Sequence, residues 1–493
     1  MNIRWNFYSI TLIASLLFIL VLKIQLFPNF LDIYYHLSVA SGFNKAGGFV
    51  TNAFWEYAPY GRVNLYPPLF HFLLLGLIKT GLPLILIARL MDVIIFPLFL
   101  LVIWFIGRSI FNDRVAFFST CMAAMTYSFY LCFSNFIPIT LGFICGLIAF
   151  WGIERNKMLF ASICLGLTFY THIQIPYFFI IVFIIYGVLV KEKRSICAKV
   201  IFLSAVLGLP FLIYLIKNIS NYNPHGMQEH FVIEASLCLV LSIFGLKKVF
   251  HQKGAYYFLL IFVIVSFLFA FFYPYRYICG QGLLGLIFIS AVGIDEILND
   301  QREKKKKLLA VILLFIFCSP SFVLTMEKEI KFVPLNSTFI NILVPNQQVE
   351  RPNDLCLYTK FTNEVVEIVK SNSDKNDIIY CNIPFSAAMI SVMAHRANSE
   401  AMLKEINPRV VSDPIANSKV IIWFKVDGPQ NRLEQIIRKY HLREIAQTQI
   451  AYVYINDACQ SKVRINKPLI SNKWVFLCLT GIFVLLVFLV RIK

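Results

Sequence analysis

Charged residues are scarce in this chain, so it has little with which to cover a soluble surface. Only 15% of the 493 residues are Asp, Glu, Lys or Arg, whereas 58% are hydrophobic. The exposed shell of a soluble domain of this length must be largely polar, so the composition excludes a wholly soluble fold. The charges lie in short clusters between apolar runs, and about 20 apolar residues suffice to cross a bilayer. We therefore expect a multi-pass protein of the cell membrane.

Signatures of disulfide, zinc and nucleotide chemistry are also missing. Of the twelve cysteines, most lie in apolar runs, and only Cys356, Cys381 and Cys459 fall in the soluble region before the last run. An odd number without CxxC spacing predicts neither a disulfide framework nor a zinc site. The G-x-G-x-x-G match at residues 280–285 lies inside an apolar run without a preceding soluble strand. Close helix packing explains these glycines better than nucleotide binding does.

A net charge of +18 would suggest nucleic-acid binding in a soluble protein. Here the excess of Lys and Arg lies largely in short segments between apolar runs: residues 108–114, 155–157, 191–194, 247–253 and 304–307. Positive short loops of membrane proteins face the cytoplasm. The clusters therefore predict which side of the membrane each loop faces. They do not indicate a nucleic-acid partner.

The apolar runs alternate so that these clusters share one side. Residues 7–26 are read as an uncleaved helix with a cytoplasmic N-terminus, and the chain then makes about 12 transmembrane crossings. The later runs are residues 84–106, 116–133, 138–151, 159–172, 176–190, 200–216, 232–246, 256–273, 277–292, 308–324 and 474–490. Both termini are then cytoplasmic, and residues 27–66 form the first outer loop.

The region before the last run is mixed in polarity, and the alternation places it outside the cell. Predicted strands at residues 377–380, 420–424 and 451–455 alternate with predicted helices at 361–371 and 433–440. Such alternation indicates a small α/β domain. We divide the chain into a transmembrane domain (1–325), an extracytoplasmic α/β domain (326–471) and a C-terminal transmembrane helix (472–493).

The first outer loop gathers the side chains that can carry chemistry. It reads D-I-Y-Y-H-L from Asp32, F-W-E-Y-A-P-Y-G from Phe54 and Y-P-P-L-F-H from Tyr66 to His71. Aromatic residues collect at membrane interfaces in any case, so they carry little weight. An acid at the mouth of a helix bundle is costly unless it is solvated or paired. Asp32 is therefore a functional candidate.

The spacing D-x-Y-Y-H-L, W-x-Y-x-P-x-G and P-P-L-F-H resembles the first outer loop of GT-C fold membrane glycosyltransferases, especially oligosaccharyltransferase catalytic subunits. The motifs cover residues 31–71, and helix order extends a looser resemblance over the chain. The resemblance implies an all-α GT-C-like bundle that moves a sugar from a polyprenyl-phosphate donor to an extracytoplasmic glycan, lipid or protein acceptor. It also implies that Asp32 lies at the active site, against a metal or as a base.

Sugar transfer sets the roles expected of these residues. A carboxylate takes the acceptor proton or positions the acceptor, which is the role predicted for Asp32. The departing lipid phosphate needs positive charge, and Arg276 in Y-P-Y-R-Y offers a planar guanidinium at an outer mouth. An interfacial, snorkelling role for Arg276 is an equal alternative. Further substrate-binding candidates are Tyr35, His36, Glu56, His71 and Glu229, with a structural hydrogen-bonding role as the favoured alternative for the two histidines.

The sequence departs from the family pattern in three places. Ser38 replaces a basic residue after the H-L pair, residues 134–136 lack the acids of the second outer loop, and the W-W-D-Y-G motif is missing. These departures argue against transfer to asparagine and weaken a metal site, because divalent cations favour several carboxylate oxygens. We therefore favour inverting, metal-independent transfer to a hydroxyl, while a Mg²⁺ or Mn²⁺ cofactor stays open.

Two other function classes stay open as well. A transporter or flippase of lipid-linked glycans would be expected to show internal repeats and paired broken helices near the midplane. The sequence shows no such duplication. A non-catalytic GT-C-like scaffold, whose outer domain binds a partner, is favoured by the missing acidic motif.

Overall fold

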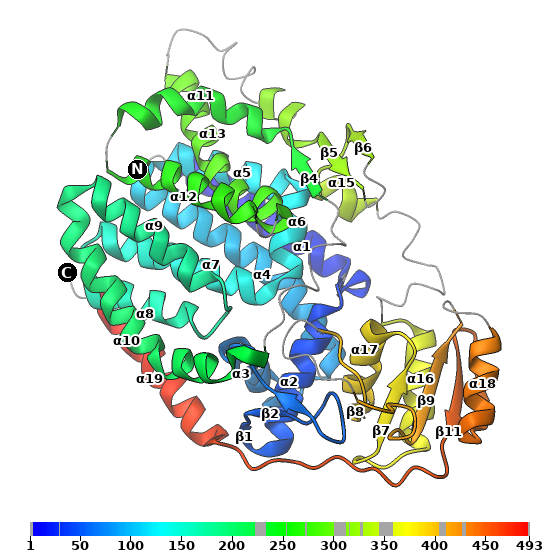
Figure 1. Cartoon of the computed structure of the whole chain (residues 1–493). Coiled ribbons are helices and arrows are strands. Elements are labelled where there is room, and N and C mark those ends of the chain that lie inside the picture. Colours follow the sequence, from blue (N-terminus) through cyan, green and yellow to red (C-terminus); the bar gives the residue numbers. More distant parts are fainter. Residues whose placement is uncertain are drawn as a thin grey trace.

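A helical bundle and a smaller sheet-containing domain make up the fold (Figure 1). The computed structural model describes residues 3–28, 30–221, 233–252, 254–271, 274–299, 312–314, 316–325, 329–344, 358–403, 411–425 and 430–491. The bundle helices are α1 (Ile3–Leu22), α4 (Leu84–Ile106), α5 (Asp113–Met125), α6 (Tyr127–Asn135), α7 (Ile137–Glu154), α8 (Met158–Thr168), α9 (Ile175–Leu189), α10 (Arg194–Asn218), α11 (Cys238–His251), α12 (Ala255–Ala270), α13 (Gly282–Asn299) and α19 (Asn472–Arg491).

Short elements connect these helices and build the first outer loop. The π-helical segments η2 (Gly107–Phe111) and η6 (Arg276–Gln281) extend α4 and precede α13. The first outer loop contains α2 (Asp32–Ala46), β1 (Gly48–Phe49), β2 (Asn52–Ala53) and β3 (Arg62–Val63), with η1 (Ile24–Leu26) before it and α3 (Leu69–Lys79) after it. The 3-10 turns η3 (Lys191–Lys193) and η4 (Ile219–Asn221) flank α10.

Six helices in the described part of the chain are long and apolar enough to cross a membrane, and several shorter apolar helices accompany them. The chain is a multi-pass membrane protein. The total of about 12 crossings stays a prediction. The apolar run 116–133 is divided at Thr126 into α5 and α6.

Two other predicted runs contain strands. The run 232–246 contributes β4 (Ile233–Ser236) before α11, and the run 308–324 ends in β5 (Ser321–Leu324). The expectation that these residues are helical was wrong. Apolar periodicity does not distinguish a short buried strand from a stretch of buried helix.

The basic clusters of separate loops meet at one end of the bundle. The Lys157 ammonium donates to the Val490 carbonyl (2.7 Å), beside the end of α19. Arg114 (2.8 Å) and Lys248 (3.8 Å) both approach the buried carboxylate of Asp295 on α13. Figure 1 draws both chain ends at the left, away from the first outer loop.

The turning points expected on the outer side meet at the opposite end. Arg89 near the start of α4 donates to the Phe27 carbonyl after α1 (3.0 Å). The Leu69 amide donates to the Tyr170 carbonyl after α8 (2.7 Å). The Tyr214 hydroxyl of α10 donates to the Asn64 carbonyl (2.8 Å). Both ends thus agree with the expected alternation, whereas the side that faces the cytoplasm stays a prediction.

The second domain is built on a five-stranded sheet in the order β10-β11-β9-β7-β8. Its strands are β7 (Ile378–Cys381), β8 (Ala397–Asn398), β9 (Val420–Phe424), β10 (Arg443–Gln447) and β11 (Ala451–Ile455), and its helices are α16 (Lys360–Ser371), α17 (Pro384–Ala394) and α18 (Gln430–Tyr440). Strand β7 is parallel to β8 and β9, whereas β11 is antiparallel to β9. The predicted α/β alternation is confirmed.

Two further pairings join distant parts of the chain. β12 (Ile470–Ser471), just before α19, pairs with β1 of the first outer loop. β5 pairs with β4 on one side and with β6 (Ile330–Val333) on the other, and β6 precedes α15 (Thr338–Leu343). This three-stranded sheet crosses the predicted boundary between residues 325 and 326, so that boundary falls between two paired strands.

Candidate active site

The first turn of α2 carries the candidate base. Asp32 occupies this turn, where the positive end of the helix dipole favours a carboxylate. Tyr35 and His36 follow at the spacing of one helical turn, so they share a face of α2 with Asp32. Asp32 is partly exposed, whereas Tyr35 and His36 are buried. The face therefore runs from the mouth of the bundle into its interior.

Two predicted site residues meet directly. His36 Nδ1 lies 3.0 Å from His71 Nε2 on α3, so one imidazole donates to the other. The Tyr66 ring packs against both, with centroids 5.0 Å from His36 and 5.5 Å from His71. Burial lowers the pKa of His36 to about 3, because desolvation disfavours the imidazolium. The pair is therefore built as neutral hydrogen-bonding groups.

Arg276 lies across an aromatic ring from the Asp32 segment. Its guanidinium carbon is 5.0 Å from the centroid of the Phe136 ring, and the residue is only 7% exposed. The same Phe136 ring is 5.3 Å from that of Phe30, two residues before Asp32. Phe136 thus joins the start of α2 to the π-helical turn of Arg276.

His172 closes the cluster between the histidine pair and Arg276. Its ring lies 6.2 Å from that of Tyr66, in the turn between α8 and α9. Burial lowers the pKa of His172 well below its ordinary value, and the Arg276 charge lowers it further. The cation and the imidazoles therefore share one corner at the outer end.

Glu56 forms a buried ion pair with Arg62. Its carboxylate accepts from Arg62 Nε at 2.9 Å, and both side chains are buried. Arg62 also donates to the Leu403 carbonyl of the second domain (2.7 Å). The pair thus fastens the loop to that domain, and substrate binding by Glu56 stays a prediction. Glu229 lies outside the described residues.

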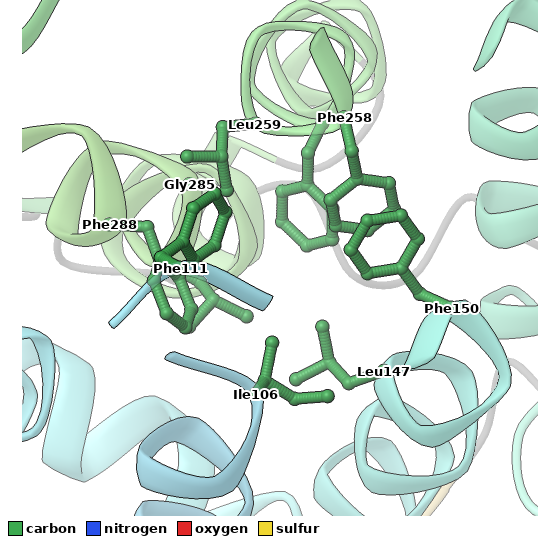
Figure 2. A pocket seen from close by; sticks show the side chains of 10 residues that line it. Ile106, Phe111, Leu147, Phe150, Phe258, Leu259, Gly285 and Phe288 are labelled. Atoms are coloured by element: carbon green, nitrogen blue, oxygen red, sulfur yellow. The ribbon is translucent and has the colours of Figure 1, made fainter. Parts of the chain in front are cut away.

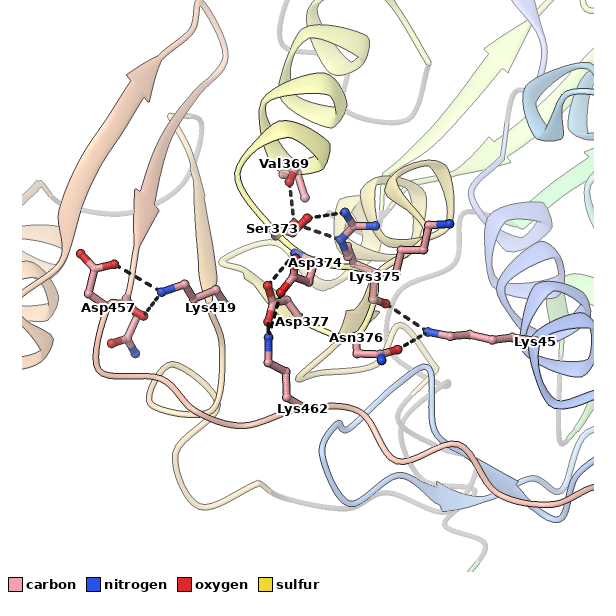
Figure 3. A network of polar contacts seen from close by, with 12 residues as sticks. Lys45, Val369, Ser373, Asp374, Lys375, Asn376, Asp377, Lys419, Asp457 and Lys462 are labelled. Atoms are coloured by element: carbon pink, nitrogen blue, oxygen red, sulfur yellow. Dashed lines mark hydrogen bonds and ion pairs between the residues drawn. The ribbon is translucent and has the colours of Figure 1, made fainter.

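The second domain holds the first outer loop in place. The amide of Asn398 donates to the Trp55 carbonyl and that of Ala58 to the Asn398 carbonyl, each at 3.0 Å. From α2, Lys45 donates to the Lys375 carbonyl and to Asn376 Oδ1, each at 3.1 Å (Figure 3). In the same network Lys462, in the segment before α19, pairs with Asp374 and Asp377.

Neither a metal cluster nor the internal pocket offers another centre. In the part of the chain that the structure describes, no three His, Cys, Asp or Glu side chains group so as to hold a metal ion. The pocket in Figure 2 lies between α4, η2, α7, α12 and α13 and is lined by apolar side chains. It offers a phosphate or a sugar hydroxyl no side-chain partner. The outer corner is therefore the candidate site.

Three residues of this corner, namely Tyr66, Phe136 and His172, are not among the sequence-based site candidates. The signal for Tyr66 was its place beside the P-P-L-F-H motif. Phe136 and His172 carried only their expected outer position. Their contacts depend on how the helices pack, which a single sequence does not reveal.

The comparisons rest on structure alone, because no protein-family model and no curated protein matches the chain. ArnT from Cupriavidus metallidurans superposes with a TM-score of 0.58 at 12% identity, covering 92% of this chain and 98% of that one. The oligosaccharyltransferase AglB from Archaeoglobus fulgidus, solved with an inhibitory peptide and a dolichol-phosphate, gives 0.56 at 10% identity, covering 85% and 69%.

Both solved structures have the GT-C fold. This chain has a GT-C-like fold. The expectation from the first-loop motifs is thereby confirmed for the architecture. At such low sequence identities the likeness concerns the fold alone and carries no activity or residue role over to this chain.

Proposed function

We propose that the chain is a membrane glycosyltransferase that moves a sugar from a polyprenyl-phosphate donor to an extracytoplasmic hydroxyl. The observation that carries the proposal is that Arg276 packs on the Phe136 ring, which also contacts Phe30, two residues before Asp32, in a GT-C-like bundle. A carboxylate and a guanidinium at one outer corner match the two charges that such a transfer develops. AglB was solved with a dolichol-phosphate, which supports a lipid-linked donor.

In the proposed reaction, the acceptor oxygen attacks the anomeric carbon from the side of Asp32. The C–O bond to the lipid phosphate breaks, and its electron pair leaves with the phosphate oxygen. The Asp32 carboxylate takes the acceptor proton, and Arg276 stabilises the charge of the departing phosphate. A single displacement of this kind inverts the anomeric centre.

The buried residues of the corner would shape the site. Tyr35, His36 and His71 form a wall of rings and neutral nitrogens below Asp32. Neutral donors and acceptors suit sugar hydroxyls, which are uncharged. The acceptor is a glycan, lipid or protein hydroxyl rather than an asparagine, because the W-W-D-Y-G motif and the second-loop acids are missing.

The test uses the full chain in proteoliposomes with a panel of polyprenyl-phosphate sugars and soluble or lipid hydroxyl acceptors. Asp32→Asn should lower transfer by about 10²- to 10⁴-fold, the usual contribution of a general base. Arg276→Gln should weaken use of the lipid phosphate, whereas Glu367→Gln, an exposed carboxylate of the second domain, should change nothing. Unchanged transfer in Asp32→Asn would show that Asp32 is not the general base. Lipid translocation without transfer would favour the flippase alternative.

A further inference from the structure

The sheet of β4, β5 and β6 has one continuous apolar face. Ala235, Phe322 and Phe332 lie opposite one another in the register, followed by Leu324 and Ile330. Phe322 is 42% exposed, Phe332 54% and Ile330 73%. The rings of Phe322 and Phe332 are in contact, with centroids 5.2 Å apart. Side chains of alternate positions share a face, so this apolar face points away from the protein.

The opposite face of the sheet holds the polar side chains that are buried. Glu234, Ser236 and Ser321 on this face are buried, and it also carries Val323, Val333 and, at the outer edge, the exposed Lys331. The Asn336 amide donates to Ser321 Oγ (2.6 Å) and to the Glu234 carboxylate. A half-solvated sheet of a soluble domain turns its apolar side inward and its polar side to water. This sheet is inverted, and such a surface requires an apolar partner.

The chain on either side of the sheet extends the apolar surface. Before β5, Ile312 and Ile316 are 43% and 53% exposed; after β6, Leu335 and Val344 are 64% and 70% exposed. A contiguous exposed apolar surface is unusual for a water-facing domain. Its continuity with the apolar run that precedes β5 favours lipid over a protein partner.

The edge of the sheet limits its depth. β6 ends the three-strand order, so its outer backbone groups have no strand partner among the described residues. An open sheet edge does not occur in the hydrocarbon core, because no water satisfies its amides there. Lys331 and Glu329, each 59% exposed in its side chain, form an ion pair of 3.4 Å at this edge. Both features place the sheet at the boundary between acyl chains and head groups.

We propose that the β4–β6 sheet lies on the bilayer surface at the Arg276 end, with Phe322, Ile330 and Phe332 against the lipid acyl chains. The sheet is also fixed to the Arg276 turn, since the Glu234 amide donates to Cys279 Sγ (3.2 Å) in η6. Granting the proposed function, this contact would hold Arg276 at the depth of lipid phosphates. The region after residue 325 would then begin in the membrane interface rather than in water.

Spin labels can measure the depth. Cysteine is placed at Phe332, at Lys331 on the other face, and at Phe385, which is 53% exposed on α17. The full chain carries Cys478→Ser, which removes the cysteine that is exposed among the described residues, together with Cys356→Ser and Cys459→Ser. It lies in nanodiscs of phosphatidylcholine and phosphatidylglycerol. The label at 332 should collide with oxygen severalfold more, relative to a water-soluble nickel chelate, than labels at 331 and 385. Labelling Phe322→Cys should repeat the lipid signature.

Equal chelate access at 332, 322 and 385 would overturn the proposal. The proposal would also be overturned if the label at 332 were inaccessible to oxygen and its spectrum were broadened by a second label nearby. That result would indicate a dimer interface. The replaced side chains are exposed, so the variants should fold. The readout involves no sugar transfer, so its failure is distinct from failure of the proposed activity.

Discussion

At the scale of single residues, the corner separates a charged carboxylate from neutral imidazoles. Asp32 is partly exposed at the start of α2, whereas His36 is buried with its pKa lowered to about 3. Burial thus leaves His36 as a neutral donor or acceptor, and in the proposed function Asp32 is the residue of α2 that takes the acceptor proton.

The lowered pKa of His36 makes stability depend on pH. Between pH 6.5, the ordinary pKa of histidine, and about pH 3, His36 is protonated in the unfolded chain but neutral in the folded chain. Unfolding free energy should therefore fall as pH drops below 6.5, by about 1.4 kcal/mol per pH unit for this residue. His36→Gln should flatten the dependence in thermal unfolding in detergent, whereas the exposed His251→Gln should not. Equal slopes in all three proteins would contradict the neutral pair.

At the scale of elements, sequence patterning predicted most bundle helices and the strands β7, β9 and β11 of the second domain, but it missed β10. The segments 420–424 and 451–455 coincide with β9 and β11, because their β-branched and aromatic residues lie between turn residues. The β4–β6 sheet was not predictable, since its apolar strands adjoin apolar helices. The meeting of His36 and His71, 35 positions apart, depends on how α2 packs on α3.

Glycines allow α11 to approach α13 closely. A Cβ on Gly245 would lie 1.8 Å from the Ile289 carbonyl oxygen, so backbone would have to move. Gly245→Ala should therefore lower stability by about 1–3 kcal/mol, the usual cost of overpacking. Gly481→Ala on α19 is the matched control, because nothing lies within 4 Å of its added carbon. Thermal unfolding in nanodiscs compares the two. Equal stability would show that the helices separate at little cost.

At the scale of the whole molecule, distant segments converge on the first outer loop. Arg62 reaches the carbonyl of Leu403, 341 positions away, and β1 pairs with β12 before the last helix. The second domain thus serves at least to hold the loop that carries Asp32. The sequence predicted the domain and its side of the bundle but not this role, because one sequence carries no record of which surfaces dock.

The same arrangement makes the orientation testable. The basic ends of several loops gather with the end of α19, and short positive loops remain in the cytoplasm. A cysteine replacing Arg438 on α18 should react with an impermeant maleimide in intact cells, whereas one replacing exposed Lys191 should react only after permeabilisation. Replacement of Cys356, Cys459 and Cys478 by Ser again supplies the background. The reverse pattern would put Asp32 and Arg276 on the cytoplasmic side and remove an extracytoplasmic acceptor. Labelling of both sites from outside would instead show that an even number of crossings separates residue 191 from residue 438, whereas the predicted runs between them give an odd number.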